Sequence, residues 1–295
     1  MVLGENSAPI LIVLGQSNAH AHATHLPDEE IIHTPLKNVH GLHRRENQAF
    51  GLSDVVWSGF TTDGMNLGET QDDTCCLANY FAAMWQKAID SGKKLPDLYI
   101  IQISVGCQGI AQFEYCGQNM WYPERELIMR PGPLGQINIS LYPLTVEILS
   151  LASMNLMMQG KTPQVIGLHW NQWECEARTK SKALNEAEAN YRNLFWGFFT
   201  ALGSDQTGKN IPLYLYRPLC DVDDKESPEI LRAIFEKFTR EYDDCRMIDL
   251  TKTSFYEADT PHHGIFRKED NVHYRPEIQR YFAELQWNDL FGNIE

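Results

Sequence analysis

Short apolar runs rich in Ile, Leu, Val and Tyr recur along the chain, and the segments between them carry apolar residues at helical spacing. Runs of this length and composition predict buried strands. The five predicted strands are Ile10–Leu14, Leu98–Ser104, Gln164–Trp170, Pro212–Tyr216 and Arg246–Leu250.

The segments between and after these strands have the pattern of amphipathic helices. Apolar residues in the first one repeat at helical spacing, and Gly92 follows where a C-terminal cap is expected. Gly160 and Gly203 end two further helices in the same way, while Pro228 and Pro276 are typical of a first helical turn. The predicted helices are Cys76–Ala88, Thr145–Gln159, Ala183–Leu202, Ser227–Thr239 and a C-terminal segment from Pro276.

This alternation predicts an α/β fold in which helices cover both faces of an open parallel sheet. A closed eight-unit barrel would need more strand signals than the chain offers. No linker or internal repeat divides residues 1–295, which are predicted to form a single domain. Ligands collect at the carboxyl ends of parallel strands, and the long irregular stretches Pro27–Thr62 and Tyr115–Gly135 are candidate binding loops.

The charge of the chain argues against two classes of partner. Lys and Arg number 25 against 39 Asp and Glu, and the net charge of −14 disfavours nucleic acid and anionic membranes. No apolar run approaches the roughly 20 residues that span a bilayer, and the N-terminal run lacks the flanks of a signal peptide. We therefore expect a soluble, cytoplasmic protein. The seven cysteines are odd in number and lack CxxC spacing, which favours a reduced compartment and no cysteine function.

Two chemistries compete in the stretch ILIVLGQSNAHAHATH, where the first predicted strand ends. Ser17 would lie at the strand end, where it could attack a carbonyl while its own N–H faces the oxyanion that forms. His20, His22 and His25 could instead bind a metal ion. A serine after a strand is more often a simple helix cap, so this stretch does not decide between the two.

Other polar groups follow the next strands. The second strand leads into SVGCQG, where Gly106 would let backbone N–H groups approach a substrate. The third leads into NQWECEA, where Gln172 could supply a side-chain donor that Glu174 or Glu176 orients. Ordinary turns and helix starts have similar sequences, so each signal is weak by itself.

Asp270 and His273 lie three residues apart just before the last predicted helix. This spacing can bring a carboxylate within hydrogen-bonding reach of an imidazole, which fixes the tautomer of the ring and stabilises its protonated form. The pair therefore has the features of a general base and its orienting acid, although a capping Asp near a surface His would look the same.

Taken together, GQSN, a Gly-containing turn, WxQxE and DxxH resemble the motifs of the SGNH hydrolase superfamily, from near residue 10 to near residue 285. Within it the chain is most similar to the carbohydrate acetylesterases of family six and the sialate O-acetylesterases. The resemblance implies a three-layer α/β/α sandwich around a five-stranded parallel sheet of flavodoxin-like order. It also implies a serine esterase that removes O-acetyl groups from a carbohydrate, with no cofactor and no metal.

The resemblance assigns roles to individual residues. Ser17 is implied as nucleophile, His273 as general base and Asp270 as its partner. The oxyanion hole would comprise the N–H groups of Ser17 and Gly106 with the Gln172 side chain. The residues implied to support or line the pocket are Gln16, Asn18, His20, Trp173 and Glu174. Several positions depart from the family pattern, namely Cys107, Gln108, Phe113, Trp173, Cys175 and Glu176.

Alternatives from other classes remain open. A metal-dependent hydrolase would use His20 and His22, with further ligands drawn from His169, His262, His263 and Asp270. A lipase or thioesterase on the same scaffold would prefer long acyl chains, and a non-catalytic relative would bind glycans without turnover. Four aromatic residues near the strand ends could stack on a sugar or pack in the core: Trp121, Tyr122, Trp170 and Trp173.

Overall fold

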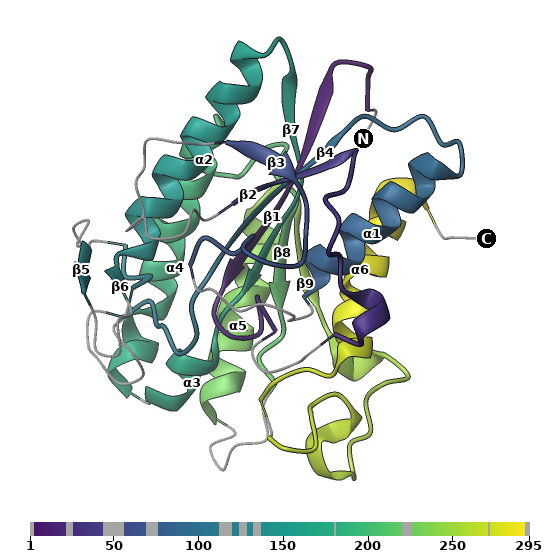
Figure 1. Ribbon diagram of the computed structural model, residues 1–295. Helices are drawn as coiled ribbons and strands as arrows, with labels where there is room; N and C mark the ends of the chain where they lie inside the picture. Colours follow the sequence, from purple (N-terminus) through teal and green to yellow (C-terminus); the bar gives the residue numbers. More distant parts are fainter. Residues whose placement is uncertain are drawn as a thin grey trace.

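The computed structural model describes residues 3–21, 26–43, 56–68, 76–111, 120–123, 129–131, 137–179, 181–219, 226–270 and 272–292. Its centre is a seven-stranded sheet in the order β3-β2-β4-β1-β7-β8-β9, in which only the β2–β3 pair is antiparallel (Figure 1). The strands are β1 (Ser7–Gly15), β2 (Val39–Leu42), β3 (Trp57–Gly59), β4 (Leu98–Ser104), β7 (Thr162–Asn171), β8 (Leu213–Tyr216) and β9 (Cys245–Ile248). A separate antiparallel pair joins β5 (Met129–Pro131) to β6 (Ile137–Ile139).

The prediction of a sheet of five parallel strands is wrong in number, although all five predicted strands are present as β1, β4, β7, β8 and β9. The two additional strands of this sheet, β2 and β3, lie in the stretch expected to be irregular. Both are short, and β2 interrupts its apolar residues with His40 and Gly41, so neither has the pattern of a buried strand. They form because β2 pairs with the exposed edge of β4.

The five predicted strands are arranged as 2-1-3-4-5 when counted in chain order, which is the flavodoxin-like arrangement. The order reverses between β1 and β7. The carboxyl ends of these two strands flank the crevice in which open α/β sheets bind ligands.

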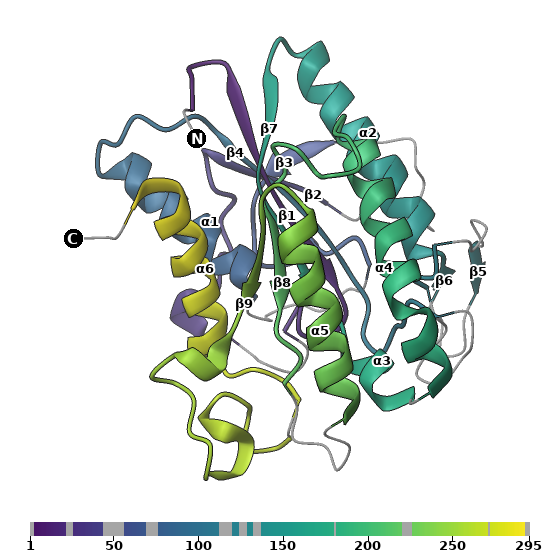
Figure 2. The ribbon, with the colours of Figure 1, turned by 180° about the vertical axis from the view of Figure 1, so that it is seen from behind.

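Helices cover both faces of the sheet and make three layers (Figures 1 and 2). One face packs against α1 (Leu77–Asp90) and α6 (Pro276–Phe291). The other packs against α2 (Leu141–Met158), α4 (Ser181–Ala201) and α5 (Glu226–Glu241), with the short α3 (Glu174–Thr179) leading into α4. The five predicted helices are confirmed with shifted ends, whereas α3 was not predicted.

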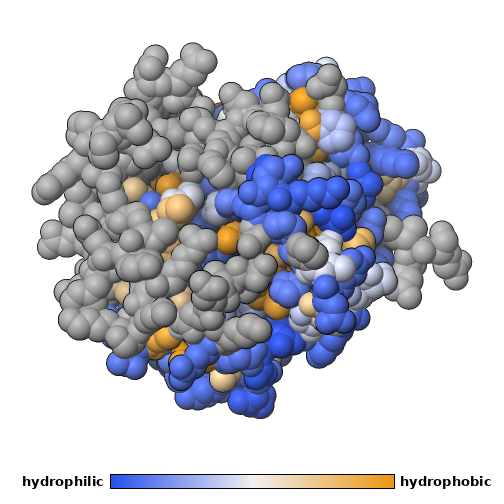
Figure 3. Space-filling view, turned by 90° about the horizontal axis from the view of Figure 1, so that it is seen from below, coloured by the Kyte–Doolittle hydropathy of each residue, from blue (hydrophilic) through white to orange (hydrophobic). Residues whose placement is uncertain are grey.

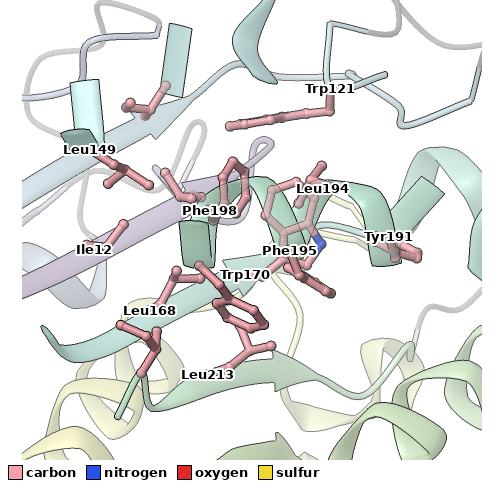
Figure 4. Close-up of a cluster of buried hydrophobic side chains, with 14 of the residues drawn as sticks. Ile12, Trp121, Leu149, Leu168, Trp170, Tyr191, Leu194, Phe195, Phe198 and Leu213 are labelled. Atoms are coloured by element: carbon pink, nitrogen blue, oxygen red, sulfur yellow. The ribbon is translucent and has the colours of Figure 1, made fainter. Parts of the chain in front are cut away.

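The core on the α2, α4 and α5 face is rich in aromatic side chains (Figure 4). Trp170 of β7 packs edge-on against Trp121 and Phe195, with ring centroids 5.0 and 5.8 Å apart. All nine residues of β1 are buried, as expected for the central strand of a sheet that is covered on both faces. This core holds the central strand ends in fixed positions.

Helix α2 is long and apolar enough to cross a membrane by length and composition alone. In the fold, 39% of this segment is buried, and its inner residues, among them Leu144 and Leu149, belong to the core. Its apolar composition is therefore accounted for in part by packing on the sheet.

Candidate functional site

The predicted site residues follow strands whose ends meet at one edge of the sheet. Gly15, the last residue of β1, pairs in register with Ser104 of β4 on one side and with Asn171 of β7 on the other. The segments that begin with Gln16, Val105 and Gln172 therefore start side by side. Figure 3 views the molecule from this end, where the described surface residues are mostly hydrophilic with small hydrophobic spots.

Gly15 is required by the close contact between β1 and β7. Its φ is +141°, and a Cβ atom there would lie 2.2 Å from the carbonyl oxygen of Asn171. The chain then makes a single turn, in which the Ala19 N–H donates to the Gln16 carbonyl over 2.8 Å, and Ala21 has a φ of +54°. The described residues 16–21 form this turn and no longer helix. Ser17 lies in this turn and is 5% exposed.

Asp270 and His273 form the hydrogen-bonded pair that their spacing predicted. His273 Nδ1 and Asp270 Oδ2 are 2.9 Å apart, and Asp270 Oδ1 accepts from the N–H groups of Val272 and His273 over 3.0 and 2.7 Å. Burial opposes ionisation, but these hydrogen bonds outweigh it and hold the pKa of Asp270 below its usual value. An ionised Asp270 places the proton of the neutral ring on Nδ1, which makes Nε2 the basic nitrogen.

Asn18 joins this pair to the turn of Ser17. Its Nδ2 donates to the Val272 carbonyl over 2.9 Å, and its Oδ1 accepts from the Tyr274 N–H over 3.2 Å. Asn18 directly follows Ser17, and Val272 and Tyr274 directly precede and follow His273. The structure therefore joins the turn that contains the predicted nucleophile to the loop that contains the predicted base, across more than 250 residues of sequence.

Glu174 lies buried beneath the same turn. Its carboxylate accepts from Asn18 Nδ2 over 2.6 Å, from Gln16 Nε2 over 2.5 Å and from the Trp173 N–H over 3.1 Å. Burial raises the pKa of Glu174 to about 7, and the hydrogen bonds only partly offset this effect. Glu174, which is 2% exposed, thus supports the predicted site from the protein interior.

The turn after β4 carries Gly106 and Cys107. Cys107 is exposed and has a φ of +56°, in the left-handed region that favours glycine. His20 is buried behind this turn, with Nδ1 3.1 Å from the Ser104 hydroxyl. His20 therefore joins the turn that follows β1 to the end of β4.

Gln172 is fully buried, and its amide donors are engaged inside the protein. Nε2 donates to the Gln108 carbonyl over 2.5 Å and to Glu176 over 3.0 Å, while Oε1 has no hydrogen-bond partner among the described residues. Glu176 also accepts from the Ile110 N–H and the Tyr191 hydroxyl, and burial raises its pKa. The oxyanion role of Gln172 stays a prediction, because in this conformation its donors point to other acceptors.

The residues that depart from the family pattern are mostly structural. Trp173 is fully buried in the core instead of lining a pocket, and the Cys175 thiol donates to Gln16 Oε1 over 3.2 Å. Trp121 and Trp170 are also fully buried, so neither is placed to stack on a sugar. Phe113 lies outside the described residues.

Those histidines of the metal hypothesis that the structure describes lie in separate places. His20 contacts Ser104, His22 and His25 lie outside the described residues, and His262 and His263 belong to the turn Pro261–Gly264. His169 is buried between the Tyr216 hydroxyl and Gln286, and burial lowers its pKa to about 4. Among the residues that the structure describes, no three His, Cys, Asp or Glu side chains gather as metal ligands.

Two hollows lined by described residues lie away from the strand ends. One of about 470 Å³ lies between α2 and α4 beside Trp196, and one of about 510 Å³ lies beside β2 and β3 at Trp57. None of the predicted site residues lines either hollow. The chemistry of Asp270 and His273 therefore locates the candidate site better than the size of these hollows.

Sequence reasoning missed two residues at the strand ends. Asn66 holds the end of β4, since its Nδ2 donates to the Ser104 carbonyl and its Oδ1 accepts from the Ser104 and Gly68 N–H groups. Asn171 lies beside Gly15 and is 1% exposed, and its Oδ1 has no hydrogen-bond partner in the described part of the chain. The position of Asn171 at a strand end could have identified it.

No protein-family model matches the sequence, and no curated protein matches it. Solved structures do match. The crystal structure of NanS has a TM-score of 0.62 at 15% sequence identity, with 98% of this chain and 99% of that chain covered. A protein from Arabidopsis thaliana has a TM-score of 0.57 at 12% identity, with 96% and 98% covered. At such identities the likeness shows the fold, and the chemistry must be argued from the residues of this chain.

Proposed function

We propose that the protein is a serine esterase that removes O-acetyl groups from a carbohydrate. The observation that carries the proposal is the Asn18 side chain, which holds the loop of the hydrogen-bonded Asp270 and His273 against the turn of Ser17. A hydroxyl, an imidazole and a carboxylate assembled in this way are the components of an acyl-transfer triad. The motif resemblance to carbohydrate and sialate O-acetylesterases supports the acetyl group and the sugar.

In the proposed reaction, Ser17 Oγ attacks the acetyl carbonyl carbon while His273 Nε2 takes the hydroxyl proton. Asp270 stabilises the imidazolium that forms. The backbone N–H groups of Ser17 and Gly106 are the proposed donors to the oxyanion, and Gln172 would join them only after its amide leaves Gln108 or Glu176.

The tetrahedral intermediate then expels the sugar oxygen, which takes the proton from His273. Water attacks the acetylated Ser17 with His273 again as base, so acetate leaves and the serine is restored. These steps use only side-chain and backbone groups of this chain and water. We further propose that the chain acts as one domain and needs no cofactor.

The test is hydrolysis of para-nitrophenyl acetate and of an acetylated glycan by the wild-type protein and by Ser17→Ala. We expect activity from the wild type, unaffected by a chelator, and none above background from Ser17→Ala. Undiminished turnover by Ser17→Ala would refute the mechanism. Loss of wild-type activity with the chelator would favour the metal-dependent alternative that uses His20 and His22.

A further inference from the structure

The contacts around Ser17 and His273 have a common form. Gln16 and Asn18 flank Ser17, and one carboxylate, that of Glu174, accepts from the side-chain amides of both. Val272 and Tyr274 flank His273, and one amide, that of Asn18, binds the backbone of both. Each predicted reacting residue is thus held through its two neighbours.

The Asn18 side chain suits this position because it offers donors and an acceptor together. Its two amide hydrogens go to Glu174 and to the Val272 carbonyl, and its oxygen accepts from the Tyr274 N–H. An Asp would lack both donors, and an apolar residue would leave the carbonyl and N–H groups of the loop unsatisfied. The Asn18 backbone is held as well, since its carbonyl accepts from Gln279 Nε2 over 2.9 Å.

We propose that Asn18 and Glu174 are positioning residues that set the placement of Ser17 relative to His273. Glu174 aligns both neighbours of Ser17, and Asn18 transmits that alignment to both neighbours of His273. This inference rests on the proposed function. It adds two residues that act through others, without contact with the substrate.

The charge of Glu174 agrees with such a role. Its two carboxylate oxygens accept from the side-chain amides of Gln16 and Asn18 and from the Trp173 N–H. A Gln in its place would avoid the desolvation that raises the pKa of Glu174 to about 7, but its single oxygen could not accept from both sides. A buried carboxylate costs desolvation free energy, but its two oxygens can accept hydrogen bonds from two amides at once.

The experiment compares Asn18→Ala and Glu174→Gln with a matched control, Gln286→Ala. Gln286 is an equally buried amide whose Nε2 donates to the Ile166 carbonyl and whose Oε1 lies 2.8 Å from His169 Nε2, and neither hydrogen bond reaches the turn of Ser17 or the loop of His273. For each variant, kcat and KM are measured with para-nitrophenyl acetate, and thermal unfolding reports stability. Ser17→Ala defines the background.

We expect Asn18→Ala to lose about 100-fold in kcat with little change in KM, because a small displacement of reacting groups costs that much. Gln286→Ala should lose comparable stability and keep its kcat, because its hydrogen bonds lie outside the site. Equal losses of kcat in the two variants, or an unchanged kcat in Asn18→Ala, would overturn the inference.

If Asn18→Ala does not fold, Glu174→Gln carries the same test, since it keeps the size of the side chain. Its kcat should fall by about tenfold, because one of the two amides can still be held. An unchanged kcat there overturns the inference as well. An inactive wild type would remove the proposed function itself, whereas an active wild type with a fully active Asn18→Ala would remove only this inference.

Discussion

Asp270→Asn is the most informative single substitution, because it changes the chemistry of His273 while keeping the shape of the loop. Asp270 Oδ1 accepts from two backbone N–H groups and Oδ2 faces His273 Nδ1 at 2.9 Å. An Asn can place its one oxygen where Oδ1 lies and keep both backbone contacts. Its NH₂ group then faces Nδ1, which must accept, so the ring proton moves to Nε2.

A proton on Nε2 removes the base that Ser17 needs. Substitution of the triad Asp by Asn costs about 10⁴-fold in kcat in serine hydrolases, which corresponds to about 5 kcal/mol of transition-state stabilisation. Stability should change far less, by about 1 kcal/mol, because the variant exchanges charge-assisted hydrogen bonds for neutral ones at retained geometry. The assay is kcat on para-nitrophenyl acetate, with unfolding in denaturant beside it.

Asp249→Asn provides a matched control. Asp249 accepts from the Thr251 N–H and hydroxyl and pairs with Arg217, so it is a capping Asp beside an Arg like Asp270 beside Arg267. This control should lose a similar amount of stability and keep its kcat. If Asp270→Asn retained kcat within about tenfold of the wild type, the orienting role assigned to Asp270 would be refuted.

Three further outcomes follow from single contacts. Gly15→Ala should reduce the yield of folded protein, because its Cβ would lie 2.2 Å from the Asn171 carbonyl oxygen; thermal unfolding close to that of the wild type would contradict the need for glycine. Glu174→Gln should remove a pH dependence of the free energy of unfolding. The pKa of Glu174 is raised from 4.5 to about 7, so this carboxyl ionises at lower pH in the unfolded chain, and the wild type loses stability as the pH rises from 4.5 to about 7. Relative to the variant, the wild type loses roughly 3 kcal/mol of unfolding free energy between these two pH values and no more above them. A difference in denaturant midpoint between wild type and variant that is the same below and above this pH range would refute the assignment. Cys107→Gly should not lower the free energy of unfolding by more than about 1 kcal/mol, because relief of the left-handed conformation offsets the added chain entropy of glycine; a larger loss would show that the Cys107 side chain stabilises the turn.

The strands and helices that could be predicted are those whose burial produces a recognisable pattern of apolar residues in the sequence. Strands such as β1 are buried on both faces and therefore read as continuous apolar runs. The strands β2 and β3 have no such run, because β2 is held by pairing with the edge of β4 and β3 by pairing with β2, so a Gly or His is tolerated there. The helices were found from their apolar spacing, and their ends shifted because caps such as Ser227 also fit inside a first turn.

The same distinction applies to the candidate site. The contact between Asp270 and His273 is local, so their spacing predicted it. The contacts of Asn18 with Val272 and Tyr274 join distant segments, and no local pattern contains them. Trp173 follows a strand end and was expected at the pocket, but tertiary packing buries it in the core. Motifs thus indicated which residues gather at the strand ends, while the direction of each side chain required the structure.

Covalent trapping tests directly whether Ser17 is a nucleophile activated by His273. The wild-type protein is incubated with a fluorophosphonate, a reagent that phosphonylates activated serines, and the modified peptide is located by mass spectrometry. We expect one adduct, on Ser17, with labelling lost in Ser17→Ala and strongly slowed in Asp270→Asn. Ester hydrolysis by a protein that shows no adduct on Ser17 would contradict this role of Ser17.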